Sequence, residues 1–246
     1  MKRSLFYVVL CVFLLGGIQA QADTATWANL TSANASSVTG TLTFGSQTVT
    51  VTYSGEVAFA ELNNTGTYWW GNGACGVSPC PVYNYSGGGQ TIDAPTTSDM
   101  IGIVGNEALH TITFSQPVVD PVLAVISLGQ GSLALGGVFT TYTFGQPFTI
   151  LTSGGGWWGG GSLNNIDGNS LQGIEGNGLV EFTGTYSSIS WSAEYPEYWN
   201  GFNVAAFGTA PEGLGPNDPP TVPEPGSMLL VGTGAAALTR LRRKKK

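Results

Sequence analysis

The fold class is indicated most clearly by residues 38–53, which read VTGTLTFGSQTVTVTY. On both sides of Gly45-Ser46, apolar side chains alternate with small or polar ones, which is the pattern of a strand with one buried face. A two-residue loop that begins with glycine is typical of a type II′ turn, so this stretch predicts a β-hairpin. The expected register places four apolar side chains on one face, Leu42 opposite Val49 and Val38 opposite Tyr53.

Similar short apolar runs, separated by Gly, Pro and Asn, continue along the chain. Helical periodicity is absent, and glycine accounts for 37 of 246 residues, about twice its usual share. We expect further strands at 57–61, 100–104, 109–114, 121–127, 133–143, 147–152, 178–183, 186–192 and 202–208. Residues 23–208 are therefore predicted to form an all-β domain, an antiparallel β-sandwich or jelly-roll-like body.

The charged residues are few and unevenly placed. Only 9% of residues are charged but 42% are apolar, so the chain has material for a core and is not of the disordered class. All eight Lys and Arg lie at the two ends. The span from residue 4 to residue 239 holds all fifteen Asp and Glu and therefore has a formal charge of −15. Nucleic acid is excluded as a partner of the body, because phosphate binding depends on Lys and Arg, whereas a sugar or a cation is compatible with this charge.

Residues 1–22 have the three parts of a secretory signal peptide. Lys2-Arg3 is basic, residues 5–15 are apolar, and Ala20-Gln21-Ala22 fits the small-x-small rule for cleavage. The apolar run is too short to span a bilayer. We therefore expect an N-terminal signal helix, export, and cleavage by signal peptidase directly before Asp23.

The C-terminal part of the chain consists of a linker, a hydrophobic segment and a basic end. Residues 209–221 are rich in proline and glycine and predict an extended linker. Residues 226–239 are uncharged, and residues 240–246 are almost entirely basic. A helix of the uncharged run would be about 21 Å long, shorter than the ~30 Å hydrocarbon core. It predicts a short transmembrane helix with its basic end in the cytoplasm.

Residues 222–246 resemble the PEP-CTERM sorting signal of bacterial surface proteins. The resemblance rests on Pro223, Glu224 and Pro225, on Ser227, on the apolar run, and on Arg242 and Arg243. It implies recognition by an exosortase-like membrane protease, transient anchoring in the inner membrane, and a final place at the cell surface or in the extracellular matrix. It also implies an association with exopolysaccharide. The alternative is a single-pass anchor that follows a proline-rich linker.

The last part of the body has a weaker likeness. Residues 177–208 are similar to the closing strands of secreted bacterial β-sandwich domains that carry varied C-terminal anchors. The similarity rests on Phe182, Ile189, Trp191, Trp199 and Phe202. It implies a fold and no particular chemistry.

Cys75 and Cys80 are the cysteines that remain after signal cleavage. Two close cysteines in an exported protein most often form a disulfide, and we expect one here. A metal site is the alternative, but His110 is the only histidine, and no metal site is predicted. His110 itself falls within an apparent strand, where we expect a half-exposed side chain with no catalytic role.

Two tryptophan doublets are candidates for glycan stacking: Trp69 with Trp70, and Trp157 with Trp158. Neighbouring side chains of a strand point to opposite faces, so only one tryptophan of each doublet can enter a core. The glycines that flank the second doublet would leave it with the least cover. The alternative is that both doublets serve as core anchors.

Two further patterns concern ions and catalysis. Residues 164–169, NNIDGN, carry side-chain oxygens at alternate positions, but the EF-hand pattern fails. A turn-rich loop is the simpler interpretation, a structural calcium ion is the alternative, and no other cofactor is expected. The carboxylates could supply a glycosidase pair, but the sequence does not show which of them face each other.

These patterns together predict an exported, non-enzymatic structural or adhesive component associated with exopolysaccharide. The alternative is a carbohydrate-binding module that uses exposed tryptophan. A glycoside-active enzyme is a further alternative, which a cleft with two facing carboxylates would favour.

Overall fold

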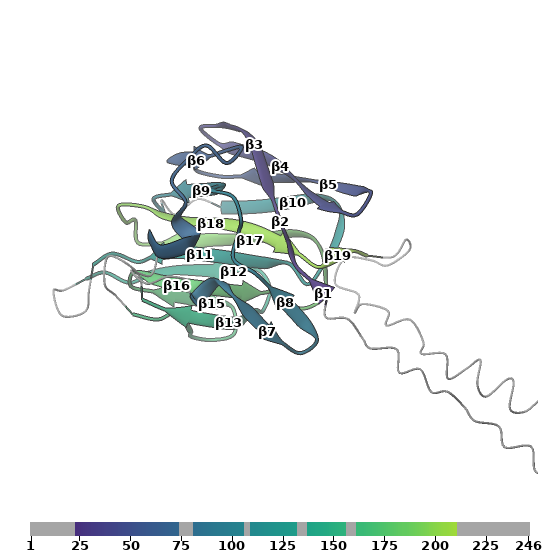
Figure 1. Ribbon diagram of the computed structural model, residues 1–246. Helices are drawn as coiled ribbons and strands as arrows, with labels where there is room; N and C mark the ends of the chain where they lie inside the picture. Colours follow the sequence, from purple (N-terminus) through teal and green to yellow (C-terminus); the bar gives the residue numbers. More distant parts are fainter. Residues whose placement is uncertain (1–22, 74–80, 106–108, 132–136, 156–160, 211–246) are drawn as a thin grey trace, which may run out of the picture.

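The structure is a computed structural model that describes residues 23–73, 81–105, 109–131, 137–155 and 161–210. These residues form two large antiparallel sheets and one small sheet (Figure 1). The nine-stranded sheet has the order β14 (Asn164–Asn165), β15 (Ser170–Gly173), β12 (Thr140–Phe144), β17 (Thr185–Glu194), β10 (Leu109–Val119), β5 (Gln47–Ser54), β4 (Ser37–Phe44) and β3 (Asn29–Asn34), with β19 (Gly208–Thr209) beside β10. The seven-stranded sheet has the order β13 (Thr149–Gly154), β16 (Gly176–Glu181), β11 (Val122–Leu128), β18 (Asn200–Ala206), β9 (Met100–Ile103) and β6 (Phe59–Glu61), with β2 (Thr26–Trp27) beside β18. The small sheet contains β1 (Asp23–Thr24), β8 (Gln90–Ile92) and β7 (Tyr85–Gly87), and the helical turns are η1 (Trp69–Gly73) and η2 (Pro81–Tyr83).

The hairpin expected from the sequence is confirmed. β4 and β5 pair in the predicted register, Leu42 with Val49 and Val38 with Tyr53, and all four side chains are buried. Gly45 has a φ of +60°, as the first central position of a type II′ turn requires. Any other residue would be strained there, so the glycine fixes both the turn and the register.

The main core fills the space between the two large sheets. Along β4 and β5 every second side chain is directed inward, which accounts for the alternating sequence. β11 and β18 instead bury every residue, because both faces of the seven-stranded sheet are covered. Trp191 lies within this core, and its ring centroid is 5.2 Å from that of Phe202. The two rings meet edge-on, so the core combines edge-to-face aromatic contacts with aliphatic packing.

A second, smaller core covers the other face of the seven-stranded sheet. The seven-stranded sheet supplies one side of this core, and the described parts of the segment between β6 and β9, which contains η1, η2, β7 and β8, lie over it (Figure 1). Trp70, Tyr83 and Ile92 from this segment are fully buried against β11. The body therefore has a third layer that the expected two-sheet sandwich did not include.

The solvent-facing side of the nine-stranded sheet is lined mainly by hydroxyl groups. One row across five strands consists of Ser32, Thr39, Thr52, Thr113 and Ser188. Threonine combines high β propensity with a polar group that carries no charge. This explains how a chain with so few charged residues can expose one face of a large sheet to water.

Several boundaries differ from the sequence-based expectations. β10 and β17 are longer than predicted, and the pairs β7–β8 and β14–β15 were not expected at all. The folded body also continues past residue 208, since β19 pairs with β10 and the Ala210 N–H donates to the Pro117 carbonyl at 2.9 Å. The first residues of the predicted linker therefore belong to the sheet.

The two ends of the described chain lie at the same end of the body. β19 pairs with β10 at Val119, and the next residue, Asp120, is close enough to Asp23 for their charges to interact (Figure 1). The predicted signal helix and transmembrane helix lie outside the described residues. Within the part of the chain that the structure describes, no helix is both long enough and apolar enough to cross a membrane.

Candidate functional site

Most of the residues predicted to act in sorting, cleavage or cross-linking lie outside the described part of the chain. They are Ala20, Ala22, Cys75, Cys80, Trp157, Trp158, Pro223, Glu224, Pro225, Arg242 and Arg243. Asp23, the predicted first residue of the mature chain, is described: it is exposed at the start of β1, and its N–H donates to the Gly89 carbonyl at 3.0 Å. The predictions on the other residues stay predictions.

The first tryptophan doublet lies in the second core. Trp70 is fully buried. Its ring packs edge-on against that of Tyr83, with 5.2 Å between the ring centroids. Trp69 is partly buried and packs against Trp199, with 5.6 Å between the ring centroids. Its Nε1 donates to Glu61 Oε1 at 3.2 Å. The proposal that Trp70 stacks on a glycan is therefore wrong, because its ring has no free face. The doublet lies in a helical turn, so the strand rule used to interpret it did not apply.

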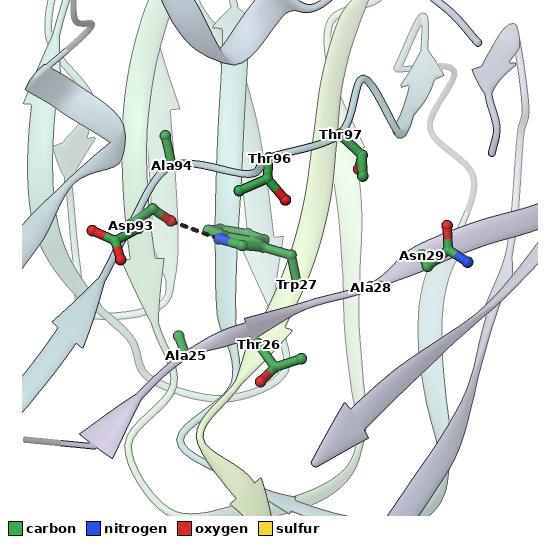
Figure 2. Close-up of a pocket in the computed structure, with 9 residues that line it drawn as sticks. All are labelled: Ala25, Thr26, Trp27, Ala28, Asn29, Asp93, Ala94, Thr96 and Thr97. Carbon is green, nitrogen blue, oxygen red and sulfur yellow. Dashed lines mark hydrogen bonds between the residues drawn. The ribbon is translucent and has the colours of Figure 1, made fainter. Parts of the chain in front are cut away.

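A cavity of about 320 Å³ lies beside a tryptophan that the sequence analysis did not single out, Trp27 on β2. Figure 2 shows its indole extending from β2 toward the segment 93–97. The residues that line this groove, here called the Trp27 groove, are Ala25, Thr26, Trp27, Ala28, Asn29, Asp93, Ala94, Thr96 and Thr97. Its volume is at the lower end of the range for small-ligand sites.

Hydrogen bonds hold the walls of the Trp27 groove together. The indole Nε1 of Trp27 donates to the Asp93 carbonyl at 2.7 Å, which fixes the ring across the groove (Figure 2). Buried Asn203 donates from Nδ2 to the carbonyls of Ala28 at 3.3 Å and Asp99 at 3.0 Å. These bonds link Ala28, directly after β2, to Asp99, directly before β9, and so support the shape of the groove.

The chemistry of the Trp27 groove is aromatic and polar with little charge. Trp27 is partly buried and contributes an aromatic wall. Hydroxyl and amide side chains surround it at Thr26, Asn29, Thr96 and Thr97, and Asp93 is the single ionisable residue of the lining. Such a lining can hydrogen-bond to hydroxyl groups and pack against an apolar ring face, but it has no group that would pair with an anion.

His110 does not have the half-exposed position expected for it. Its side chain is fully buried between Tyr53 and Trp191, and its Nδ1 lies 2.7 Å from the Tyr53 hydroxyl. Burial lowers the pKa of His110, and the charge of Glu56 opposes this only in part. Its strand, β10, is central in the nine-stranded sheet, so the inward face of the strand is covered by the opposite sheet. The imidazole is therefore a neutral part of the core.

We expect the lowered pKa of His110 to make the protein less stable in mild acid. Below about pH 6.5 the unfolded state takes up a proton that the folded state does not, so unfolding becomes easier by at most about 1.4 kcal/mol per pH unit. The His110→Gln variant cannot titrate and should lose less stability than the wild type between pH 7 and pH 5. Urea unfolding at the two pH values checks this, and equal losses in both proteins would contradict it.

Two buried acidic side chains, Glu175 and Glu197, lie near the C-terminal end of β11. Glu197 Oε1 accepts from the Gly129 N–H at 3.0 Å and from Asn200 Nδ2 at 2.6 Å. Burial, with a further contribution from the charge of Glu175, raises the pKa of Glu197 to about 8. Glu175 is hydrogen-bonded to the Ser127 hydroxyl and to the Gly131 N–H. Both side chains are therefore hydrogen-bonded within the protein and link the loops that contain Gly129 and Gly131 to the segments that contain Glu175 and Glu197.

The loop at residues 164–169 uses its oxygens internally. The Asp167 carboxylate accepts from the N–H groups of Asn169 and Ser170 at 2.9 and 2.7 Å, and these bonds lower its pKa. Asn165 Oδ1 accepts from the Gly168 N–H at 2.7 Å. Among the described residues, no group of three His, Cys, Asp or Glu side chains is placed to hold a metal ion. The described loop is a hydrogen-bonded turn, and calcium binding to it stays untested.

Comparison with known protein families matches residues 221–244 to the PEP-CTERM protein-sorting motif. The chain carries a PEP-CTERM motif. No curated protein and no solved structure matches the chain. The resemblance stated from residues 222–246 is therefore confirmed.

The PEP-CTERM motif bears on how the protein is sorted. It supports export and membrane-associated sorting by an exosortase, a membrane protease. The described body ends at Ala210, eleven residues before the matched segment begins. The motif is thus separated from the β-structure by the predicted linker.

Two features of the body escaped the sequence analysis. Trp27 is a single tryptophan in a short polar stretch, TATWAN, and nothing local marks it as the wall of a groove. Glu197 lies in a loop-like stretch, EYPEYWN, that predicts an exposed carboxylate. In both cases the environment is supplied by segments distant in the chain, residues 93–97 for Trp27 and Gly129 for Glu197.

Proposed function

We propose that the protein is a non-enzymatic structural or adhesive component of the cell surface or extracellular matrix, associated with exopolysaccharide. The observation that carries this proposal is the PEP-CTERM motif at residues 221–244. The motif supports export and membrane-associated sorting, and here it is preceded by a folded β body. The proposed function therefore depends on the sorting of the protein and on the exposed surface of the β body.

The arrangement of the body supports this role. Its first and last described residues lie at one end, so both predicted membrane-directed segments would leave from that side. The opposite end and the hydroxyl-lined sheet would then face outward. The absence of Lys and Arg from residue 4 to residue 239 favours neutral over anionic neighbours.

A carbohydrate-binding module is the second candidate, and one observation favours it. The Trp27 groove combines an aromatic wall with neutral hydrogen-bonding groups. The tryptophans first considered for this role give less support, because Trp70 is buried and Trp69 is partly covered. A binding function would therefore use a different tryptophan from those expected.

We expect the sorting of the protein to depend on two separate parts of the tail. Deleting residues 240–246 removes the basic end that holds the tail in the cytoplasm, and replacing Pro223, Glu224 and Pro225 by alanine removes the recognition element. Either change should leave most of the protein in the membrane or in the wrong compartment. Cell fractionation with surface protease accessibility measures this outcome.

The matched control for the sorting experiment lies in the predicted linker. Replacing Pro219 and Pro220 by alanine alters prolines of the same tail without touching the motif. This variant should reach the surface as the wild type does. Normal surface exposure of both tail mutants would refute the sorting role.

A further inference from the structure

We propose that the Trp27 groove is a binding site for a neutral sugar residue of a polysaccharide chain. This inference rests on the proposed association with exopolysaccharide and deepens the second candidate function by naming the class of sugar that the groove would bind. Three observations carry it: the fixed aromatic wall, the polar rim, and the absence of any cation. Each selects for one property of the ligand.

The aromatic wall selects for a ligand with a flat apolar face. The bond from Trp27 Nε1 to the Asp93 carbonyl favours the ring position in which the indole lines the groove. A pyranose ring presents several C–H groups on one face, and these can pack on an indole while the hydroxyl groups of the sugar keep their hydrogen bonds. Because the ring is fixed in the free protein, little side-chain entropy is lost on binding.

The polar rim selects for hydroxyl groups around that face. Thr26, Asn29, Thr96 and Thr97 supply hydroxyl and amide groups that both donate and accept hydrogen bonds. The Asp93 side chain is exposed and can accept two hydrogen bonds, while its carbonyl is already used by Trp27. A sugar hydroxyl can donate to one of these groups and accept from another.

The charge of the groove selects against acidic sugars. Asp93 is the only ionisable residue of the lining, and no Lys or Arg occurs between residues 4 and 239. A uronic acid or sulfated sugar would therefore meet a carboxylate with no compensating cation. A neutral hexose meets no such repulsion.

The rigidity of the groove indicates a preformed site. Leu30 N–H donates to Asp99 Oδ2 at 2.9 Å, and Asn203 bridges the carbonyls of Ala28 and Asp99. Asp99 and Asn203 are both buried, so these bonds are shielded from water. These shielded bonds next to the lining favour a groove that needs little rearrangement on binding.

Affinity electrophoresis of the full-length protein tests the proposal. The protein is purified in a detergent without sugar groups and run through native gels that contain dextran, a mixed-linkage β-glucan, galactomannan or the anionic polysaccharide alginate. We expect retardation by at least one of the three neutral polymers and weak or no retardation by alginate. Trp27→Ala should weaken binding to the retarding polymer roughly ten-fold.

A second variant guards against loss of folding, because Trp27 also packs on the second core. Asn29→Ala combined with Thr96→Val removes polar groups of exposed residues and should weaken binding several-fold with an unchanged melting temperature. Tyr198→Ala is the matched control, since this aromatic side chain is 83% exposed and lies outside the groove. It should bind as the wild type does.

The outcomes separate the groove from the broader function. Retardation of the wild type with no change in the groove variants would overturn the site and leave the association with polysaccharide intact. Retardation by alginate alone would overturn the neutral class of the ligand. A wild type that migrates freely in all four gels would overturn both the groove and the proposed association.

Discussion

Replacing Trp70 by alanine should lower the melting temperature of the protein by roughly 6–20 °C. Removal of a large buried aromatic side chain costs about 3–5 kcal/mol, and one kcal/mol corresponds to about 2–4 °C in a domain of this size. Trp70 is fully buried and packs edge-on against Tyr83, which is also fully buried.

Two further variants show whether the loss comes from packing. Trp70→Phe should cost much less than Trp70→Ala, because an aromatic ring is kept and Trp70 Nε1 has no hydrogen-bond partner among the described residues. Tyr198→Ala, which removes an exposed ring, should leave the melting temperature nearly unchanged. Calorimetry of the three variants measures these effects. A Trp70→Ala protein as stable as Tyr198→Ala would show that the second core does not hold this ring.

Replacing Glu197 by glutamine should remove a large part of the loss of stability that we expect in alkali. The pKa of Glu197 is raised from 4.5 to about 8 in the folded protein. Between these values the folded state holds a proton that the unfolded state has released, so the free energy of unfolding falls as the pH rises. From pH 5 to pH 9 this group alone should lower it by about 4 kcal/mol. Glutamine keeps an oxygen that accepts from Gly129 and Asn200 but cannot ionise.

Urea unfolding at pH 5, 7 and 9 checks the prediction for Glu197. The free energy of unfolding of Glu197→Gln should rise relative to that of the wild type from pH 5 to pH 7 and again from pH 7 to pH 9. Glu194→Gln is the matched control, since Glu194 is an exposed carboxylate three residues earlier. Because Glu197 is unchanged in this variant, it should still lose stability in alkali. Parallel curves for the wild type and Glu197→Gln would contradict the raised pKa.

Local sequence patterns were sufficient for the parts of the protein in which neighbours along the chain decide the outcome. The β4–β5 hairpin was predicted with its register because a two-residue turn and a period of two leave only one way to put Leu42 and Val49 on the same face. The PEP-CTERM motif was identified for a similar reason, since its three parts follow one another within 24 residues. Strand positions followed from alternation, while short polar strands such as β14 carried no such signal.

The tertiary structure alone decided which side chains are buried and what their burial does. The sequence shows Trp69 and Trp70 as equivalent neighbours, but only Trp70 is enclosed by Tyr83 and the outer face of β11. His110 and Glu197 have ordinary local contexts, and their pKa values are shifted because distant segments exclude water from them. The Trp27 groove likewise exists only because residues 93–97 lie beside β2. Hydrophobic periodicity is a property of adjacent residues, whereas desolvation depends on every segment that packs around a group, and the sequence does not state which segments those are.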